Sequence, residues 1–430
     1  MKILFLTDNF PPESNAPATR TYEHCIEWVK KGAEITVITC APNYPKGEIF
    51  PSYKNKLYQV EIMDGIKVIR VWTYISPNRG MLRRILDYIS FCVSGFIASL
   101  FVKTDVIIAT SPQLFTTVAG YMASFVKRRP WVMEVRDLWP ESIMAVGAMK
   151  KSKILKILDQ VVLFLYKKAD QIVVVTDSFK ERIHDCGVVN DRIHVVKNGV
   201  HLHNFIDKGK HQSLLQSLNL KGKFVIAYIG THGMAHKLDF ILDCAKKIKN
   251  KQIHFLFVGE GALKSRLLKQ IKTQDLTNVT MLDGVPKDKV ADYISLADVA
   301  LITLRKKDTF KKVIPSKIFE NAAMGKPILL GVEGEAKQII ERYNAGLCFE
   351  PENEIDFLQK VTSIYYDIEQ YQSFKEGCKI LAANFNRQNL AFKMLEVIES
   401  IDTIPAISRS GRLPELAMDR AKAASERKVS

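Results

Sequence analysis

The sequence predicts an α/β fold built from two Rossmann-like domains, whose parallel sheets face each other across a cleft. Short apolar runs alternate with helix-like segments over most of the chain, which is typical of βαβ units. The alternation begins at residues 2–7 and begins again at residues 224–229. Because 430 residues are enough for two full hydrophobic cores, we expect an N-terminal domain over 1–200 and a C-terminal domain over 201–384. The Ser-, Pro- and Arg-containing segment 403–430 is expected to be a basic, loosely ordered tail.

Composition is that of a globular protein kept in a reducing compartment. Hydrophobic residues make up 47% of the chain and charged residues 25%. The seven cysteines are scattered, with no C-x-x-C pair and no His/Cys cluster at zinc spacing, which favours free thiols and argues against a structural metal. The apolar run 3–6 is followed at once by polar Thr7, so no signal peptide is expected.

The net charge of +16 suggests an acidic partner. No helix-turn-helix, RNA-recognition or zinc-finger signature accompanies the basic residues, so nucleic acid is a weak candidate. An anionic lipid surface fits better, because each nearby basic residue contributes about 1 kcal/mol to such binding. Plain solvated charge is the alternative. The basic clusters comprise Arg79, Arg83, Arg84, Lys127, Arg128, Arg129, Lys150, Lys151, Lys153, Lys156, Lys167 and Lys168.

An uncharged, largely apolar helix is expected at residues 88–102, directly after Arg83 and Arg84. It is too short to cross a bilayer, which requires about 20 apolar residues. It is either a buried core helix or a helix lying in the membrane interface with the arginines on headgroups.

Two loops of the N-terminal half follow predicted strands and therefore lie where open α/β sheets bind ligands. In the first, the small residues Asn15 and Ala16, with Arg20 behind them, permit a close approach of phosphate; the alternative is a loop that only turns the chain. The second is the run 136–141. The carboxylates, the guanidinium and the indole of this run suit the binding of a sugar. The alternative is that Arg136 pairs with Asp137 and that the indole belongs to the hydrophobic core. This run contains Arg136, Asp137, Trp139 and Glu141.

Three loops of the C-terminal half also occupy strand ends. The first places glycine after a strand and before a helix, so that backbone can approach a phosphate. The second is a weak G-x-G turn, and the third is the loop 283–286. The candidate residues in them are Gly230, Thr231, His232, His236, Lys237, Gly259, Glu260 and Val285.

The stretch 314–327 predicts a short helix with both ends marked. Pro315 and Ser316 begin it, with the Ser316 side chain as the expected cap, and Gly325 ends it. Lys317 adds positive charge at the start, and Glu320 follows one turn after Ser316 on the same face. Lys317 could bind a phosphate and Glu320 the hydroxyls of a ribose, so the two residues together suit a nucleotide diphosphate. The alternative is an ordinary helix with both charges solvated.

These runs together resemble retaining, nucleotide-sugar-dependent glycosyltransferases of family 4, which have the GT-B fold. The strongest match is P-S-K-x-F-E-x-x-A-x-G-K-P at 315–327, and the R-D-L-W-P-E run at 136–141 resembles bacterial O-antigen and capsule enzymes that transfer L-fucosamine or N-acetylfucosamine. The similarity also implies a helix at 385–402 that crosses back to the first domain. It also implies that Val285 lies in the loop whose backbone recognises the base of the nucleotide.

The chain departs from the family pattern at positions where charge or glycine is usual. Asn15 and Ala16 replace a Gly-Gly pair, Thr231 replaces an Arg, and His236 replaces a Lys, with Lys237 next to it. Lys312 stands where a first Glu, eight residues before Glu320, usually holds the donor sugar. These differences put the usual phosphate and sugar contacts in doubt.

The resemblance implies transfer of a sugar, with retention, from a nucleotide diphosphate-sugar to a lipid-linked acceptor of the undecaprenyl-diphosphate type. The donor would carry a UDP-linked amino-deoxy sugar, and no metal cofactor is expected. Asp137, Arg136 and Glu141 would be catalytic, while Arg83, Arg84 and Trp139 would meet acceptor or membrane. The expected location is the cytoplasmic face of the plasma membrane. Three alternatives remain: a nucleotide-sugar 2-epimerase of the same architecture, an inactive membrane-associated assembly protein, and a nucleic-acid binder.

Overall fold

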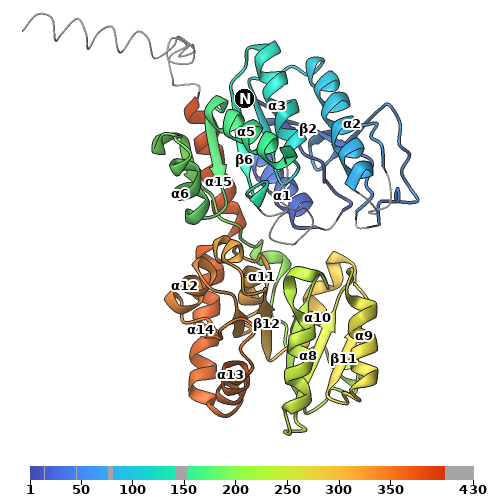
Figure 1. The fold of residues 1–430 in the computed structure, drawn as a ribbon, viewed down its shortest axis with the longest axis vertical. Helices are drawn as coiled ribbons and strands as arrows, with labels where there is room; N and C mark the ends of the chain where they lie inside the picture. Colours follow the sequence, from blue (N-terminus) through green and yellow to red (C-terminus); the bar gives the residue numbers. More distant parts are fainter. Residues whose placement is uncertain (14, 45, 76–80, 142–152, 402–430) are drawn as a thin grey trace, which may run out of the picture.

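The computed structural model describes residues 1–13, 15–44, 46–75, 81–141 and 153–401. The expected tail and the basic residues Arg79, Lys150 and Lys151 lie outside these ranges. Two sheets, one in each half of the chain, organise the described residues (Figure 1).

The first sheet has the strand order β3-β4-β2-β1-β5-β6-β7-β8. All neighbouring pairs are parallel, as predicted, except β3 and β4, which form an antiparallel hairpin at one edge. The reason is a two-residue connection, Asp64 and Gly65, both with positive φ (48° and 81°), which can join only antiparallel strands. The strands are β1 (Lys2–Leu6), β2 (Glu34–Cys40), β3 (Tyr58–Met63), β4 (Ile66–Val71), β5 (Val106–Thr110), β6 (Trp131–Val135), β7 (Gln171–Val174) and β8 (Ile193–Val195).

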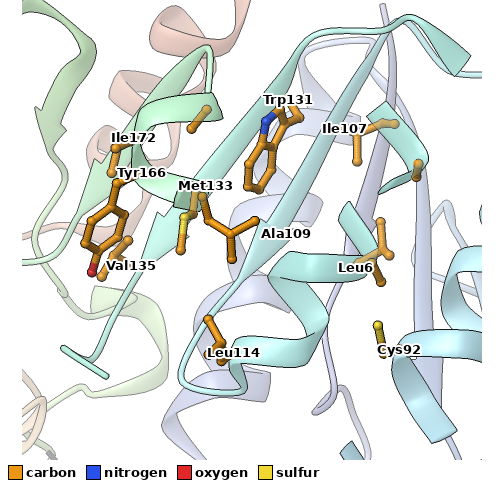
Figure 2. Close-up of a cluster of buried hydrophobic side chains, with 14 of the residues drawn as sticks. Leu6, Cys92, Ile107, Ala109, Leu114, Trp131, Met133, Val135, Tyr166 and Ile172 are labelled. Carbon is orange, nitrogen blue, oxygen red and sulfur yellow. The ribbon is translucent and has the colours of Figure 1, made fainter. Parts of the chain in front are cut away.

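Helices cover both faces of this sheet. One face buries a core that includes Trp131, Met133 and Leu6 beneath helices α2, α3, α5 and α6 (Figure 2). The other face packs on α1, whose Trp28 is fully buried. The helices are α1 (Ala16–Lys30), α2 (Met81–Leu100), α3 (Leu114–Lys127), α5 (Lys153–Lys168) and α6 (Asp177–Asp185).

The second sheet has the order β11-β10-β9-β12-β13-β14, and each neighbouring pair is parallel. Its strands are β9 (Phe224–Ile229), β10 (Ile253–Val258), β11 (Val279–Leu282), β12 (Val299–Thr303), β13 (Ile328–Gly331) and β14 (Gly346–Cys348). The helices around it are α7 (Gln212–Ser217), α8 (Leu238–Lys247), α9 (Lys264–Thr273), α10 (Val290–Leu296), α11 (Lys317–Ala323), α12 (Glu335–Arg342), α13 (Glu354–Tyr366) and α14 (Ile368–Asn384).

The last described helix, α15 (Arg387–Ser400), packs against α1 of the first half, as Figure 1 shows. The indole N–H of Trp28 donates to the carbonyl of Ala391 at 2.8 Å, and Met394 and Ile398 are buried against the sheet. Helix α15 and the first half of the chain therefore share one hydrophobic core. The division of the chain at residues 200 and 384 stays a prediction.

Helix α2, which contains most of the segment 88–102, is buried on one face and exposed on the other. Phe91 and Cys92 are buried in the core, whereas Val93 and Ile97 on the outer face are about half exposed (52% and 50%). Within the described ranges, no helix has the length and apolarity needed to cross a membrane.

Candidate functional site

Lys317, the first residue of α11, lies against the end of strand β9. A Cβ added at Gly230 would lie 2.0 Å from Lys317 Cε, so glycine is needed there for this side chain to pass. The Lys317 ammonium lies 5.2 Å from the ring centroid of Tyr228. Among the described residues it has no hydrogen bond or ion pair, and burial lowers its pKa. A cation without an ion pair in a low-dielectric position is suited to an anionic ligand.

Glu320 lies one turn further along α11. It is half-buried and makes no side-chain hydrogen bond or ion pair within the described ranges. Burial raises its pKa, while the charges of Lys317, Lys287 and Arg387 lower it. The structure thus brings Lys317 and Glu320 together beside the first half of the chain, as the sequence predicted.

Ser316 does not cap α11 with its side chain, so that expectation is wrong. The residue is already in a helical conformation (φ −59°, ψ −25°), whereas a capping side chain requires an extended residue. Backbone carbonyls accept the first N–H groups instead: Pro315 O from Ile318 at 3.1 Å and Ser316 O from Phe319 at 3.1 Å.

His232 is fully buried, and neither ring nitrogen has a hydrogen-bond partner in the described part of the chain. Its backbone is held at both ends, donating to Glu260 O at 2.7 Å and accepting from Leu263 N at 3.0 Å. Burial, with Lys264 nearby, lowers its pKa to about 4, so the ring is neutral near pH 7. A neutral ring can contact a phosphate as a hydrogen-bond donor but supplies no charge.

Gly259 and Gly261 have a structural role that the G-x-G pattern did not predict. A Cβ at Gly259 would lie 1.9 Å from Gly230 O, and one at Gly261 would lie 2.5 Å from His232 O. The glycines let the two loops pack backbone to backbone. Glu260 then joins the third loop, because its Oε1 accepts from Gly284 N at 3.1 Å and pairs with Lys264 at 2.8 Å. The half-buried Val285 follows in that loop.

The other polar residues of the 230–237 loop are engaged within the protein. Burial and the charge of Lys317 lower the pKa of His236 to about 3, while a hydrogen bond to the Thr303 backbone opposes this shift. Lys237 pairs with Asp239 at 3.5 Å. Thr231 is exposed and within hydrogen-bond reach of the Tyr44 phenol from the first half. Lys317, whose side chain lies beside Gly230, is therefore a cation next to this loop that has no ion pair within the described ranges.

Arg136 is held by the first sheet and its neighbouring helix. Its Nη1 donates to Pro17 O at 3.2 Å and Thr21 Oγ1 at 3.3 Å, and it lies 3.7 Å from Glu134 Oε2. Burial lowers its pKa to about 10. The ionic partner of Arg136 is thus Glu134, while Asp137 beside it is half-buried.

Trp139 and Glu141 line a cavity of about 280 Å³ between this loop, α5 and α6. Trp139 packs edge-on to Tyr88 of α2 at 6.2 Å. The guanidinium of Arg182 donates to Glu141 at 2.8 and 2.7 Å, so this carboxylate already has an ionic partner.

Asn15 and Ala16 begin α1. The Asn15 side chain accepts from Ala18 N at 2.9 Å and caps the helix, and Ala16 is exposed. Arg20, which was expected to help a phosphate approach this loop, is engaged within the protein instead. Arg20 is buried, pairs with Glu134 at 2.8 Å and donates to the Val196 carbonyl at 2.9 Å, which fixes the segment leaving β8.

Sequence reasoning missed two groups near these loops. Glu23 of α1 joins Lys287 (3.1 Å) and Arg387 (3.0 Å), which links the two halves. Asp8 lies just after β1, and burial, followed by the charge of Asp87 of α2, holds its pKa well above the usual range. The position of Asp8 at a strand end could have identified it from sequence.

No group of three or more metal-ligating side chains occurs within the ranges that the structure describes. Arg83 and Arg84 are exposed on α2. Exposed apolar residues continue from this helix over α3 and α5, and we call this set the apolar face: Leu86, Ile89, Val93, Ile97, Phe101, Met122, Phe125, Val126, Ile154, Ile157 and Phe164.

Two family comparisons cover most of the chain. Residues 17–204 match "Glycosyltransferase Family 4", and residues 211–379 match "Glycosyl transferases group 1". The two sheet-containing halves and these matches define a glycosyltransferase of the GT-B type. The chain belongs to glycosyltransferase family 4 and is an enzyme of the hexosyltransferase kind.

Relatives carry the same class of name. WcaI of Escherichia coli K12, named for glycosyl transfer in colanic acid biosynthesis, is 25% identical over 367 residues, which cover 82% of this chain and 89% of WcaI. WbjE of Pseudomonas aeruginosa, named as a glycosyltransferase, is 25% identical over 54% of this chain and 59% of its own. Anabaena Alr3699/HepE, solved with UDP and glucose, is 17% identical with a TM-score of 0.70, covering 93% of this chain and all of that one, and shares the fold.

Proposed function

We propose that this enzyme transfers a sugar, with retention of anomeric configuration, from a UDP-linked amino-deoxy sugar to a lipid-linked saccharide during cell-surface polysaccharide synthesis. The observation that carries the proposal is the pair of charged side chains on α11, Lys317 and Glu320, neither of which has a hydrogen bond or ion pair among the described residues. The ammonium suits a diphosphate and the carboxylate suits ribose hydroxyls, and both groups lie beside the first half of the chain.

Lys317 would stabilise the negative charge that develops on the diphosphate as the bond to the sugar breaks. A fixed ammonium in a water-poor position can do this without a metal ion, and we propose a metal-independent reaction. Transfer that continues unchanged in excess EDTA is the expected result. Loss of transfer that Mg²⁺ or Mn²⁺ restores would contradict it.

The UDP moiety is proposed because Alr3699/HepE, which shares the fold, was solved with UDP. The L-fucosamine or N-acetylfucosamine identity rests on the R-D-L-W-P-E run at 136–141 alone. Because Lys312 replaces the first acidic residue of the family pattern, the donor sugar must be held in another way.

The acceptor is proposed to be an undecaprenyl-diphosphate-linked saccharide of O-antigen or capsule type, reached from the inner face of the plasma membrane. The relative named for colanic acid biosynthesis supports this class of product. The apolar face and the adjoining Arg83 and Arg84 support membrane contact, because exposed apolar patches of this extent usually meet another surface.

A donor screen tests the proposal directly. Purified protein is incubated with nucleotide diphosphate-sugars and a prenyl diphosphate saccharide in anionic vesicles, and mass spectrometry detects the product. We expect UDP release together with a lipid product heavier by one amino-deoxyhexose. Free UDP without a new lipid product would favour the epimerase. Absence of any turnover, with nucleotide still bound, would favour the inactive assembly protein.

A further inference from the structure

A cavity of about 280 Å³ lies in the first half of the chain, between the loop that follows β6 and helices α5 and α6. Pockets for drug-sized ligands usually have about 300–1,000 Å³, so this cavity has room for one sugar ring rather than for an extended saccharide. Its lining combines an indole and aliphatic side chains with the polar groups of Tyr166, Glu141, Asp159 and Arg182. Such a mixture suits a sugar, which has an apolar face of C–H groups and a rim of hydroxyls.

The phenol of Tyr166 is a buried polar group without a partner in this cavity. Tyr166 is 4% exposed, and its ring belongs to the core cluster of Figure 2. The residue lines the cavity, and its hydroxyl makes no hydrogen bond with another described residue. Burial raises the pKa of this phenol, so the group is protonated near pH 7 and can donate. Because a buried tyrosine hydroxyl usually has a partner, an oxygen of a ligand in the cavity is suited to this place.

The carboxylate of Glu141 presents a second open position. Both bonds from the guanidinium of Arg182 end on Oε1 of Glu141, at 2.8 Å from Nε and 2.7 Å from Nη2. Oε2 has no hydrogen-bond partner in the described ranges. The ion pair therefore holds the carboxylate in place while one oxygen stays available to a hydroxyl or an amide N–H of a ligand.

The charge of the cavity selects against anions. Asp159 of α5 is exposed and makes no hydrogen bond or ion pair with the described residues. Burial and the charge of Glu141 raise its pKa, while Arg182 lowers it, so these three groups act on one another. Two carboxyl groups thus stand against one guanidinium. A phosphate or a uronic acid would meet repulsion here, whereas a neutral sugar would not.

The cavity lies between the 136–141 run and the apolar face. Leu138, which lines it, directly follows Asp137. Leu163, on the α5 side of the lining, is 37% exposed, and the next residue, Phe164, belongs to the apolar face. An acceptor whose lipid lies on the apolar face would therefore reach the cavity with a sugar close to its lipid, next to the loop that carries Asp137.

We propose that this cavity binds one uncharged sugar residue of the acceptor saccharide. Tyr166 donates to an oxygen of that residue, the open oxygen of Glu141 accepts from a hydroxyl, and Trp139 packs against the C–H face of the ring. The inference rests on the proposed transferase function and adds a requirement on the acceptor: the sugar bound here carries neither phosphate nor carboxylate.

The first test measures transfer by Tyr166→Phe, which removes only the hydroxyl. The donor is the one found in the screen, and the acceptor is a prenyl diphosphate saccharide in anionic vesicles. We expect the KM for the acceptor to rise by about five- to tenfold, the effect of one lost hydrogen bond, with kcat and UDP affinity within about twofold of wild type. Tyr343→Phe is the control, because the half-buried Tyr343 packs on Phe385 in the second half. It should keep the wild-type KM.

Stability separates a contact with the ligand from a contact within the protein. Because the Tyr166 hydroxyl has no hydrogen bond with the described residues, Tyr166→Phe should melt at the wild-type temperature or slightly above it. A clearly lower melting temperature would show that the hydroxyl is bonded within the protein, and would overturn the inference.

A further test does not depend on transfer. Saturation-transfer NMR compares the binding of two probes, the neutral methyl N-acetylglucosaminide and the anionic methyl glucuronide. We expect wild type to prefer the neutral probe, and Tyr166→Phe to bind it about fivefold more weakly. Asp159→Asn should reduce the preference by about threefold, because it removes one of the two negative charges. Asp185→Asn, exposed on α6 and outside the cavity lining, should leave the preference unchanged.

The outcomes distinguish this inference from the proposed function. If wild type transfers sugar while Tyr166→Phe keeps the wild-type KM for the acceptor, the inference is wrong and the proposed function stands. Equal binding of the neutral probe to wild type and Tyr166→Phe would place the sugar elsewhere and would also overturn it. If wild type transfers no sugar to any acceptor, the proposed function itself fails.

Discussion

The carboxylate of Glu335 in the second half binds the beginning of helix α6 in the first half, next to Ser178. Its oxygens accept from Asp177 N and Ser178 N, each at 3.2 Å, and from Lys197 Nζ at 2.7 Å. Glu335 is 7% exposed. One buried side chain therefore caps a helix of the other half and neutralises a lysine beside it.

Glu335→Ala should destabilise the protein by about 1.5–3 kcal/mol, the usual value of hydrogen bonds to a charged group. Lys197 keeps Asp177 as a partner at 2.6 Å, so the loss should stay within this range. Urea unfolding measures the change. The control is Glu333→Ala, because within the described part of the chain Glu333 pairs with the exposed Lys311 alone. Equal stability of the two variants would show that the contact between the halves contributes nothing.

Glu320→Ala should weaken UDP binding about tenfold or more, since removing a charged hydrogen-bond partner costs on the order of 1.5–3 kcal/mol. The fold should survive, because the wild-type carboxylate has no hydrogen-bond or ion-pair partner among the residues that the structure describes. Calorimetric titration with UDP measures the affinity. The exposed Glu341 of α12, replaced in the same way, should leave it unchanged. Equal affinities for wild type and Glu320→Ala would exclude Glu320 from the nucleotide site.

Gly230→Ala should displace Lys317, because the new Cβ would lie 2.0 Å from Lys317 Cε. UDP affinity should then fall to about that of Lys317→Ala, and the double variant should lose little more, because coupled residues are not additive. Gly233→Ala in the same loop is the control, with its nearest atom at an ordinary 3.5 Å. Fully additive losses would show that the glycine and the lysine act separately.

Strands and helices were predictable where apolar residues form a clear run or recur at a regular spacing along the sequence. Strands β1 (Lys2–Leu6) and β9 (Phe224–Ile229) form where the sequence predicts buried apolar runs, at residues 2–7 and 224–229. Strand β3 was missed because its residues are mostly exposed at the sheet edge, so no buried apolar run marks it. Its Asp64-Gly65 turn was a usable signal, since such a pair is typical of hairpins.

The position of the candidate site was predictable only because its loops follow the ends of predicted strands. Lys317 and the Gly230 loop meet because both follow parallel strands of one sheet. The partners of charged residues could not be predicted in the same way, because they depend on long-range packing. Arg20 is held by Glu134, which is 114 residues away, and Lys237 by Asp239 and Glu352. A basic residue in a loop therefore indicates charge but not whether a ligand can use it.

Arg83→Ser with Arg84→Ser should move the protein from anionic vesicles to the supernatant in a flotation assay. Two surface charges contribute about 2 kcal/mol at low salt, and added salt should reduce the wild-type binding as well. Lys269→Ser with Lys272→Ser is the control, since it removes the same charge from exposed positions on α9. If both double variants bind equally well, the attraction is only a matter of net charge and α2 is not the contact.

Asp137→Asn keeps the shape of the side chain and removes its charge. Asp137 follows β6, next to Arg136, whose guanidinium is fixed by Glu134, Pro17 and Thr21. If the charge orients the acceptor or stabilises the anomeric centre, transfer should fall by roughly a hundredfold with UDP affinity nearly unchanged. Steady-state transfer and calorimetry with UDP separate the outcomes. A collapse of UDP affinity would place Asp137 in the nucleotide site. A change in melting temperature, with transfer and UDP affinity unchanged, would show that Asp137 has a structural role only.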